Sequence, residues 1–353
     1  MDNTFKHLLI QGEQSIKEGL SIMDKVGYKL LIVIDDTGRF LNLLTIGDVQ
    51  RAIIANKSLH SSISSILEDK MIIVARDNDT REWIKEQMLH YRLAYMPVLD
   101  NRNNILKIIY WEDIIEDKSP VFENLNLPVV IMAGGFGSRL KPLTNVLPKP
   151  LLPYGNQTIL ENIIDRFKRY NCHQFDISVN YKAELIQFYF DSMTDKDYTI
   201  DFFTEDKPLG TAGSLHLLKE KLNNTFFVSN CDILIDEDYA AIYNYHQSNK
   251  NELTIVASVK SYDIPYGTIE TGEDGMLVSL KEKPQLDYLI NCGMYILEPH
   301  LLNEIPENIF FHITDLIEKV KLRSGRIGVF PISDKSWIDI GEWQFYSRIL
   351  FGN

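Results

Sequence analysis

A glycine-rich segment stands out because its residue types could hold a phosphate group. Gly134, Gly135 and Gly137 fill three of four consecutive positions after a strand-like apolar run. Glycines let backbone N–H groups crowd around an anion without clashes from Cβ atoms. Arg139 and Lys149 follow, and their cationic groups can bind phosphate oxygens. The segment therefore predicts a phosphate-binding loop.

Two common phosphate motifs do not match this loop. The sequence contains no Gly-Lys-Ser or Gly-Lys-Thr, which excludes a P-loop, and Leu140 stands where a G-x-G-x-x-G motif needs its last glycine. A tight structural turn is the other interpretation of a lone glycine loop. The longer string is more specific, because G-G-x-G-x-R-L-x-P-L-T is followed by P-K-P-L-L-P.

The full string resembles the nucleotidyltransferase family that makes nucleoside-diphosphate sugars, over about residues 127–349. The resemblance implies that Ala133, the three glycines and Arg139 hold the triphosphate of a nucleotide. It also implies that Lys149 stabilises the α-phosphate and its transition state. We therefore expect a nucleoside triphosphate as one substrate.

Two acidic residues match the metal site of the same family. Asp232 ends a strand-like run, and Asp339 lies in a Trp-x-Asp-x-Gly segment. Two carboxylates suit Mg²⁺, which prefers oxygen ligands together with substrate phosphates. The resemblance thus implies Mg²⁺ as the cofactor. Cys231 stands before Asp232 where the family usually has glycine, which is a small departure.

Residues 205–214 resemble the family's base-recognition loop. Gly210 would allow close approach of the backbone to the base, and we expect Thr211 to begin the next helix. Glu205 lies five residues before Gly210, where thymidylyl and uridylyl relatives commonly have Gln. A carboxylate can accept both donors of a guanine edge, so Glu205 favours guanine, whereas an amide suits uracil or thymine. The alternative is that Glu205 faces solvent.

The sugar side of the resemblance comes from three short segments. It implies that Lys283 holds the phosphate of a sugar 1-phosphate and acts in catalysis. It also implies that Tyr266, Gly267, Glu282 and Asn291 bind the sugar. Taken singly, each has a simpler explanation, such as a solvated ion pair for Glu282 and Lys283 or a turn for Asn291.

The elements that must position these residues follow a regular alternation. From residue 127 onward, strand-like runs alternate with helical patterns near 158–170, 183–190 and 211–221. Such alternation predicts an α/β fold, and the resemblance specifies a Rossmann-like, doubly wound mixed sheet. Ligands bind beyond the carboxyl ends of the strands in such sheets.

The first 118 residues contain an internal repeat. A shift of 65 residues pairs Ser15 with Thr80 and Asp35 with Asp100 without a gap. Each copy, about 5–62 and 66–118, predicts a helix N-cap, a helix, a β-hairpin with a polar turn and a second helix. We expect the two α+β copies to pack together as one module.

The repeat resembles a tandem pair of CBS domains, a regulatory module that commonly binds adenine or guanine nucleotides. Thr45 and Asp48 look like the family's Ser/Thr-x-x-Asp ribose-binding element. The second copy keeps the acid, Asp113, but has Tyr110 in place of the hydroxyl residue, so it departs from this element. The simpler interpretation is that Asp48 and Asp113 only cap helices.

The combined resemblance predicts transfer of a nucleoside monophosphate from a nucleoside triphosphate to a sugar 1-phosphate. Glu205 favours GTP as that triphosphate. The relatives it resembles act on mannose, heptose or glucosamine 1-phosphate, the last in bacterial nonulosonic (legionaminic) acid synthesis. Two alternatives stay open. One is a CDP-, UDP- or dTDP-sugar synthase on the same fold, and the other is a non-catalytic CBS nucleotide sensor.

Composition and charge limit the remaining classes. The 353 residues carry 36 basic and 49 acidic side chains, a net charge of -13, so a nucleic-acid binder is not expected. The N-terminus shows no signal-peptide pattern, no apolar run would span a membrane, and three scattered cysteines suit a cytoplasmic location. We predict a regulatory domain over 1–120, a catalytic domain over 121–353, and a homo-oligomer.

Overall fold

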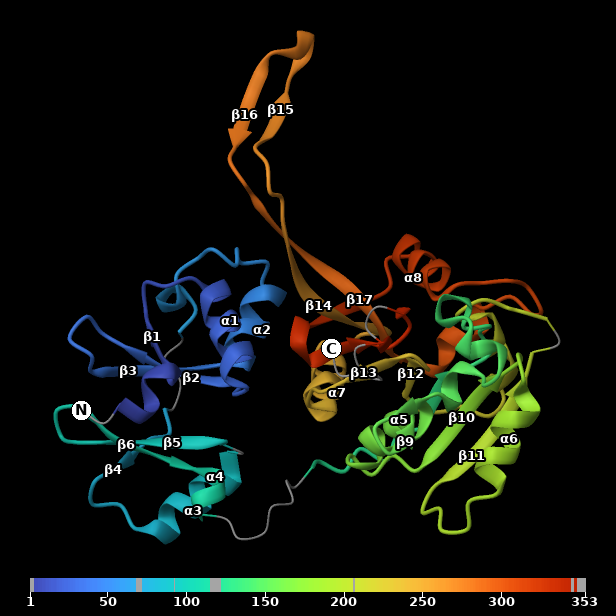
Figure 1. Ribbon diagram of the computed structural model, residues 1–353, viewed down its shortest axis with the longest axis horizontal. Helices are drawn as coiled ribbons and strands as arrows, with labels where there is room; N and C mark the ends of the chain where they lie inside the picture. The colour runs from blue at the N-terminus through green and yellow to red at the C-terminus, as the bar shows by residue number, and fades with distance from the viewer. Residues whose placement is uncertain are drawn as a thin grey trace. The chain divides into compact units, whose positions relative to one another are not determined.

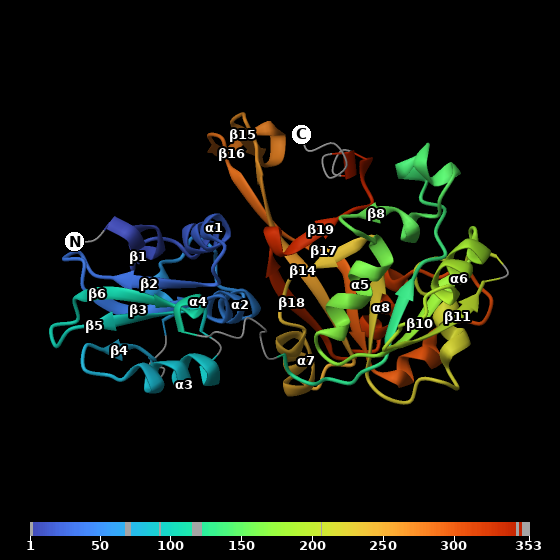
Figure 2. The same cartoon turned by 60° about the horizontal axis from the view of Figure 1, so that its bottom comes forward.

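The computed structural model describes residues 3–67, 72–91, 93–114, 122–205, 207–343 and 346–347. Contacts between residues divide the chain into two units, residues 1–121 and residues 122–353, which we call unit 1 and unit 2. The boundary expected after residue 120 falls within residues 115–121, which lie outside the described residues. Figures 1 and 2 show both units.

Unit 1 consists of two copies of one β-α-β-β-α arrangement. In each copy the middle strand pairs in parallel with the first strand and antiparallel with the last. The first copy follows a short 3-10 helix and contains β1 (Leu9–Gln11), α1 (Ile16–Val26), β2 (Leu30–Ile34), β3 (Phe40–Thr45) and α2 (Ile46–Ile54). The second contains β4 (Ala75–Arg76), α3 (Arg81–Tyr91), β5 (Tyr95–Leu99), β6 (Ile105–Tyr110) and α4 (Trp111–Ile114).

Residues that the repeat pairs have the same local roles in the two copies. Ser15 forms a capping box at the start of α1, and the Thr80 hydroxyl accepts a hydrogen bond from the backbone N–H of Trp83 in α3 at 3.2 Å. Asp35 and Asp100 each accept backbone N–H groups within the turn of their hairpin. These local interactions explain why a repeat that is weak in identity folds twice in the same way.

The two copies share one hydrophobic core, as the sequence predicts. Leu30, Ile32 and Phe40 of the first copy pack with Tyr95 and Leu99 of the second. The Tyr95 hydroxyl, which is buried in this core, donates a hydrogen bond to the backbone oxygen of Leu30 at 2.6 Å. A β-α-β-β-α unit of this size has too little apolar surface to be stable alone, so the shared core holds the pair together.

Unit 2 is built on a seven-stranded mixed sheet, as predicted. Its strand order is β11-β10-β7-β12-β17-β14-β18, and only the pairs that β17 makes are antiparallel. The strands are β7 (Val129–Met132), β10 (Gln174–Val179), β11 (Thr199–Thr204), β12 (Phe226–Asn230), β14 (Leu253–Asp263), β17 (Gln285–Leu297) and β18 (Ile327–Ser333).

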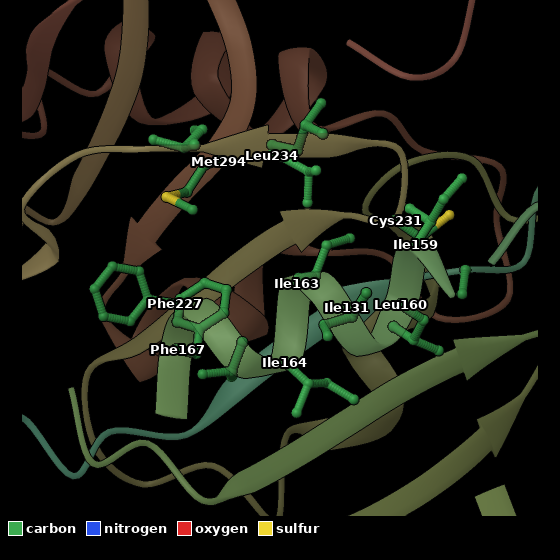
Figure 3. Close-up of a cluster of buried hydrophobic side chains, with 14 of the residues drawn as sticks. Ile131, Ile159, Leu160, Ile163, Ile164, Phe167, Phe227, Cys231, Leu234 and Met294 are labelled. Atoms are coloured by element: carbon green, nitrogen blue, oxygen red, sulfur yellow. The ribbon is translucent and has the colours of Figure 1, made fainter. Parts of the chain in front are cut away.

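Both faces of this sheet are covered. On one face Ile131 belongs to a hydrophobic core that includes side chains of α5 (Ile159–Lys168), α6 (Ala183–Asp191) and α7 (Tyr239–Ser248), and Figure 3 shows α5 lying on the strands. On the other face Val130 packs against α8 (Ile313–Leu322) and two 3-10 helices, η6 (Gly213–Leu218) and η8 (Pro299–Glu304). Adjacent residues of a buried strand point to opposite faces, which explains the continuous apolar run in β7.

Two details of unit 2 differ from the sequence expectations. The helix predicted near 211–221 is the 3-10 helix η6, which begins only at Gly213. The backbone N–H groups of Ala212 and Gly213 both donate to the backbone oxygen of Phe311, so tertiary contacts hold this turn outside an α-helix. In addition, β14 and β17 extend beyond the sheet and carry a second hairpin, β15 (Thr268–Thr271) and β16 (Leu277–Lys281), at their far end (Figure 1).

The remaining elements of unit 2 are short. Besides those named elsewhere, they are η3 (Ser138–Leu140), η4 (Leu143–Asn145), η5 (Lys149–Leu151), β8 (Pro153–Tyr154), β9 (Gln157–Thr158), β13 (Ile233–Ile235), η7 (Glu273–Gly275), η9 (Asp334–Ser336) and β19 (Trp337–Asp339). All three cysteines are buried free thiols. Within the described part of the chain, every helix is too short or too polar to cross a bilayer.

Candidate active site

A cavity of about 380 Å³ lies beyond the carboxyl ends of β7 and β12. The loops that follow β7, β11 and β12 line it, together with segments near 310–312 and Gly341. Adjacent parallel strands end at the same edge of a sheet, so the topology brings these loops together. Nine of the predicted site residues line the cavity: Gly134, Gly135, Gly137, Arg139, Lys149, Glu205, Gly210, Thr211 and Asp232.

The glycine loop is tightly packed at Gly137. Its φ angle is +61°, and a Cβ atom there would lie 2.8 Å from Thr144 Cγ2 and 3.1 Å from Lys149 Cβ. The Thr144 hydroxyl also donates a hydrogen bond to the backbone oxygen of Gly137 at 3.0 Å. A cluster of contacts therefore fixes the loop in a left-handed conformation that favours glycine. At Gly135, by contrast, a Cβ atom would meet open space.

Lys149 and Arg139 bring two positive charges to the cavity. The Lys149 side chain is 9% exposed and forms an ion pair with Asp232, while the Arg139 guanidinium lies 3.6 Å from Asp232 Oδ2 and is 60% exposed. Arg139 therefore points toward solvent at the mouth of the cavity, and Lys149 lies at its floor. Both cationic groups can approach an anion bound beside the glycine loop.

The two predicted metal ligands lie close together. In the antiparallel pair of β13 and β19, Ile233 lies opposite Asp339, which brings Asp339 next to Asp232. A Cβ atom on Gly341 would lie 2.7 Å from Asp232 Oδ2, 2.8 Å from Asp339 Oδ1 and 2.9 Å from Lys149 Nζ. The carboxylates of Asp232 and Asp339 and the ammonium group of Lys149 therefore meet around Gly341. This glycine is the last residue of the Trp-x-Asp-x-Gly motif.

This pair of acids fits a magnesium ion. Burial first, and then the neighbouring charge of Asp232, raise the pKa of the Asp339 carboxyl. A divalent cation between the two groups would relieve that repulsion, and carboxylate oxygens are the ligands that Mg²⁺ prefers. Within the described residues no group of three or more His, Cys, Asp or Glu side chains could hold a metal, so substrate phosphates would complete the coordination.

Glu205 also lines the cavity and is only 6% exposed. Its Oε1 accepts a hydrogen bond from the Ser178 hydroxyl at 2.6 Å, and its Oε2 accepts one from the backbone N–H of Leu209 at 3.0 Å. A Cβ atom on Gly134 would lie 3.2 Å from Oε1. Glu205 therefore does not face solvent. Its carboxylate is fixed next to the glycine loop, with lone pairs left on both oxygens.

The loop around Gly210 is held by the segment before α8. Gly210 has a φ angle of +83°, and a Cβ atom there would lie 2.7 Å from the backbone oxygen of Phe311. The expectation that Thr211 begins the next helix is wrong. Its hydroxyl accepts a hydrogen bond from the backbone N–H of Ile313 at 3.0 Å, at the start of α8. Packing between segments far apart in sequence thus decides the role of Thr211.

The predicted sugar-binding residues lie elsewhere. Tyr266, Gly267, Glu282 and Lys283 flank β15 and β16 and are not among the residues that line the cavity. A Cβ atom on Gly267 would lie 2.9 Å from Glu282 Oε2, so these segments lie side by side. The structure therefore separates the two halves of the predicted site.

Asn291 of β17 lies closer to the cavity. Its side-chain oxygen accepts a hydrogen bond from the backbone N–H of Gly293 at 3.0 Å. A Cβ atom on Gly293 would lie 2.5 Å from Nδ2 of Asn230, which lines the cavity. Asn291 is thus connected to the nucleotide half of the site through Gly293 and Asn230.

Ala133 is buried in the protein interior and does not line the cavity. It is 1% exposed, and its backbone N–H donates to the backbone oxygen of Ser178. Several residues that line the cavity were not predicted from the sequence. Some adjoin its motifs and could have been found there: Met132, Phe136, Ser138, Pro208, Asn230, Cys231 and Gly341. Phe310 and His312 had no motif to signal them.

In unit 1, Thr45 and Asp48 form a capping box at the start of α2. Asp48 Oδ2 accepts hydrogen bonds from the Thr45 backbone N–H and hydroxyl, both at 2.8 Å, and its other oxygen pairs with Arg51. Asp48 is 2% exposed. Asp113 likewise accepts the backbone N–H of Tyr110 at 3.3 Å. In these contacts, Asp48 and Asp113 therefore act as helix caps.

A comparison with family models now identifies the larger unit. The model described as Nucleotidyl transferase matches residues 128–350, which is more than half of the chain. The chain belongs to the nucleotidyl transferase family. The matched range contains every residue of the cavity and the whole seven-stranded sheet.

Individual relatives of this nucleotidyl transferase have related names. It is 35% identical over 230 residues to a mannose-1-phosphate guanylyltransferase catalytic subunit beta of Drosophila pseudoobscura pseudoobscura, covering 60% of this chain and 58% of the relative. It is 29% identical over 224 residues to a mannose-1-phosphate guanylyltransferase of Mycobacterium tuberculosis, covering 62% of each. The chain thus spans about three-fifths of the length of these curated relatives.

A solved structure shows the same fold. The crystal structure of HddC from Yersinia pseudotuberculosis matches with a TM-score of 0.50 and 26% identity, covering 63% of this chain and 97% of that one. A putative glucose-1-phosphate thymidylyltransferase from Bacillus anthracis, at 21% identity and a TM-score of 0.50, shares the fold as well. The sheet of unit 2 is thus that of nucleotidyl transferases.

Proposed function

We propose that this chain transfers GMP from GTP to a sugar 1-phosphate, which yields a GDP-sugar and pyrophosphate. The observation that carries the proposal is the buried carboxylate of Glu205, held beside the glycine loop by Ser178 and the Leu209 backbone. A carboxylate only accepts hydrogen bonds, and guanine presents two adjacent donors, N1–H and the N2 amino group. The guanylyltransferases among the relatives support the same base.

The reaction needs positioning and charge neutralisation more than a covalent nucleophile. A phosphate oxygen of the sugar 1-phosphate forms a new bond to the α-phosphorus of GTP. The bond from that phosphorus to the bridging oxygen of the β-phosphate breaks, and its electron pair leaves with pyrophosphate. The attacking oxygen is already an anion near neutral pH, so the reaction requires no general base.

Different residues of the cavity bind the triphosphate and neutralise its charge. The backbone around Gly135 and Gly137 binds the triphosphate, and Arg139 neutralises charge on the leaving pyrophosphate. Lys149 lies at the floor beside Asp232 and stabilises negative charge that develops on the α-phosphate. Asp232 and Asp339 would hold Mg²⁺, which when bound neutralises phosphate charge and aligns the triphosphate.

The identity of the sugar 1-phosphate is independent of the choice of nucleobase. We propose a mannose-, heptose- or glucosamine-like 1-phosphate, and the relatives named for mannose 1-phosphate support the first of these. Use of glucosamine 1-phosphate would connect the product to nonulosonic (legionaminic) acid synthesis. Both substrates are metabolites of the cytoplasm, so we place the reaction there. Purified protein offered each sugar 1-phosphate with GTP and Mg²⁺ distinguishes these substrates.

A panel of nucleotides tests the choice of base. Pyrophosphate release is measured with GTP, CTP, UTP, dTTP and ATP for the wild type and for Glu205→Gln. We expect GTP to be preferred by the wild type, and kcat/KM for GTP to fall about 10–100-fold in the variant, since a donor then faces the donors of guanine. Glu184→Gln, on the exposed side of α6, is the matched control. Preference for CTP, UTP or dTTP would instead support the corresponding sugar synthase.

We also propose that unit 1 is a CBS pair that regulates the enzyme. The shared core of two β-α-β-β-α copies supports this assignment. Thr45 and Asp48 would have to open their capping box to bind a ribose. Addition of AMP, ATP, GDP or GTP should shift the melting temperature or change the rate. If none of them does either, the sensing role fails.

A further inference from the structure

Two aromatic side chains line the nucleotide cavity, and the transfer of a phosphate group requires neither of them. Phe310 and His312 lie in the segment directly before α8, and both border the cavity. Phe310 is 58% exposed although its ring is large and apolar. Ligand pockets are lined mainly by apolar and aromatic side chains, so an aromatic ring left open in a pocket is typical of a contact surface for the ligand.

The segment that carries these two rings is fixed by the core of unit 2. Phe311 and Ile313 are buried in that core, 8% and 5% exposed, and the exposed residues Phe310 and His312 alternate with them. Side chains two residues apart in an extended chain point to the same side, and the φ and ψ angles of His312 are extended. The Phe311 backbone N–H also donates a hydrogen bond to the Leu209 backbone oxygen at 2.8 Å. Phe311 is therefore the anchor that turns both rings toward the cavity.

The two rings support each other. Their centroids lie 4.7 Å apart and their planes are 81° apart, which makes them an edge-to-face pair. Nδ1 of His312 lies 3.3 Å from the Thr211 hydroxyl oxygen, and the backbone N–H of His312 donates a hydrogen bond to Asp315 at 2.7 Å. His312 is thus held from two sides and packs against Phe310. Because the planes are nearly perpendicular, only one of the two rings can lie flat against a planar ligand.

The part of a nucleotide that suits an aromatic ring is its base. Phosphates and ribose are polar on all sides, whereas a base has an apolar π face and a polar edge. The segment also lies next to the loop that follows Glu205, because a Cβ atom on Gly210 would lie 2.7 Å from the Phe311 backbone oxygen. A carboxylate that accepts hydrogen bonds from the edge of a base leaves both faces of the base uncovered. A ring that packs on one face would fix the plane of the base.

We infer that the base of the bound nucleotide stacks on the Phe310 ring, and that His312 is a positioning residue that holds this ring in place. Stacking tolerates any base, because every base has a π face. Phe310 therefore supplies affinity for the nucleotide, whereas Glu205 supplies the preference for guanine. The inference rests on the proposed function for the identity of the nucleotide, and not for the stacking itself.

Calorimetric titration of GTP with Mg²⁺, without any sugar phosphate, tests the stacking. Phe310→Ala should raise the Kd for GTP about 5–100-fold, which is the loss expected when one base–aromatic stack is removed. Inorganic triphosphate carries the phosphates without a base, so its Kd should not change, and its binding shows that the cavity is still folded. Phe188→Ala removes a ring that is 75% exposed on α6 and is the matched control. An unchanged Kd for GTP, or an equal loss for inorganic triphosphate, would overturn the inference.

The variant Phe310→Trp gives a spectroscopic readout. An indole ring can stack on a base as a phenyl ring does, so the affinity for GTP should be kept. GTP should quench the emission of the added tryptophan, and inorganic triphosphate should not. The wild type contains four tryptophans, and its own change in emission is subtracted. Emission of the added tryptophan that GTP leaves unchanged would contradict the stacking.

A double-mutant cycle tests the role of His312. His312→Ala should weaken the binding of GTP. The double variant with Phe310→Ala should bind GTP no more weakly than Phe310→Ala alone, because His312 acts through Phe310. His312→Phe keeps a ring beside Phe310 and should restore most of the affinity. Additive losses would overturn the positioning role, since His312 would then contact the nucleotide itself.

The outcomes separate this inference from the proposed function. If the wild type releases pyrophosphate from GTP, and Phe310→Ala binds GTP as tightly as the wild type does, the stacking is wrong and the proposed function stands. If the binding of GTP depends on Phe310 but no sugar 1-phosphate yields pyrophosphate, the proposed function fails and the stacking stands.

Discussion

The two halves of the candidate site are built in opposite ways. The nucleotide half lies on the sheet edge, and its side chains are fixed before any ligand arrives: Glu205 is 6% exposed and Lys149 8% exposed. The residues predicted to bind the sugar flank the projecting hairpin of β15 and β16, where Tyr266 is 76% exposed. Because the side chains of a fixed cavity are already ordered, little conformational entropy is lost when a ligand binds. Under the proposed function, the sheet edge therefore presents a preformed nucleotide site, whereas the predicted sugar-binding residues are largely open to solvent.

The largest effect should come from removing the centre of the fixed half. Asp232→Ala should lower pyrophosphate release at least about 10³-fold, because a metal ligand and the partner of Lys149 disappear together. A coupled pyrophosphate assay measures the rate, and a thermal melt confirms that the protein is folded. Asp191→Ala at the end of α6 is an exposed control. If Asp232→Ala retained its turnover, the assignment of Asp232 as a metal ligand would be wrong.

Two lysines allow a direct comparison between the halves. Lys149→Ala should reduce kcat about 10²–10³-fold, since its charge acts on the reacting phosphate. The change should also lower the melting temperature, because Asp232 loses a buried partner. Lys283→Ala should raise KM for the sugar phosphate while the affinity for GTP and the melting temperature stay the same. Steady-state kinetics and calorimetric titration of GTP measure these effects. Similar behaviour of both variants would contradict the division into halves.

A single methyl group tests how closely the fixed half is packed. In Gly341→Ala, the new Cβ atom would lie within 3 Å of Asp232, Asp339 and Lys149. These groups must move, and a displacement of about 1 Å can cost about 10²-fold in rate. Gly47→Ala is the control, because a Cβ atom there meets nothing closer than 3.4 Å. Equal rates for Gly341→Ala and the wild type would show that the three groups are not held tightly.

The smallest effect concerns the anchored end of β14. Glu252, directly before β14, accepts hydrogen bonds from Arg323, His300 and the backbone of Arg326. These contacts, the one from Arg323 above all, lower the pKa of Glu252 from 4.5 to about 2. Because the pKa is lower in the folded state, the stabilisation is present above pH 4.5 and is lost as the pH falls toward 2.

The variant Glu252→Gln should therefore be less stable than the wild type by about 1–3 kcal/mol at pH 7. The difference in the free energy of unfolding should shrink as the pH falls from about 4.5 to about 2. Urea unfolding over that range measures it. A difference that does not change with pH would show that the charge of Glu252 does not hold this end of the strand.

Much of the fold follows from local patterns in the sequence. The capping residues Ser15 and Thr80 and the turn residues Asp35 and Asp100 act within a few positions along the chain, so the repeat could be predicted. The alternation after residue 127 likewise predicted an α/β fold, and the family resemblance added the mixed sheet that the structure shows. The prediction for Thr211 was wrong because its hydroxyl lies near the starts of two helices, η6 and α8. Tertiary packing, which the sequence does not show, places it at the start of α8.

The residue types of the candidate site follow from short motifs in the sequence, since the glycine loop, Lys149 and the acids Asp232 and Asp339 each belong to a motif of adjacent residues. The place where these groups meet depends on the tertiary structure. Sheet topology brings both acids to Gly341, buries Glu205, and adds Phe310 and His312 from a distant loop. It also places Lys283 directly after the projecting hairpin of β15 and β16. Distances between residues far apart in the chain depend on how strands pair and pack, which no local pattern encodes.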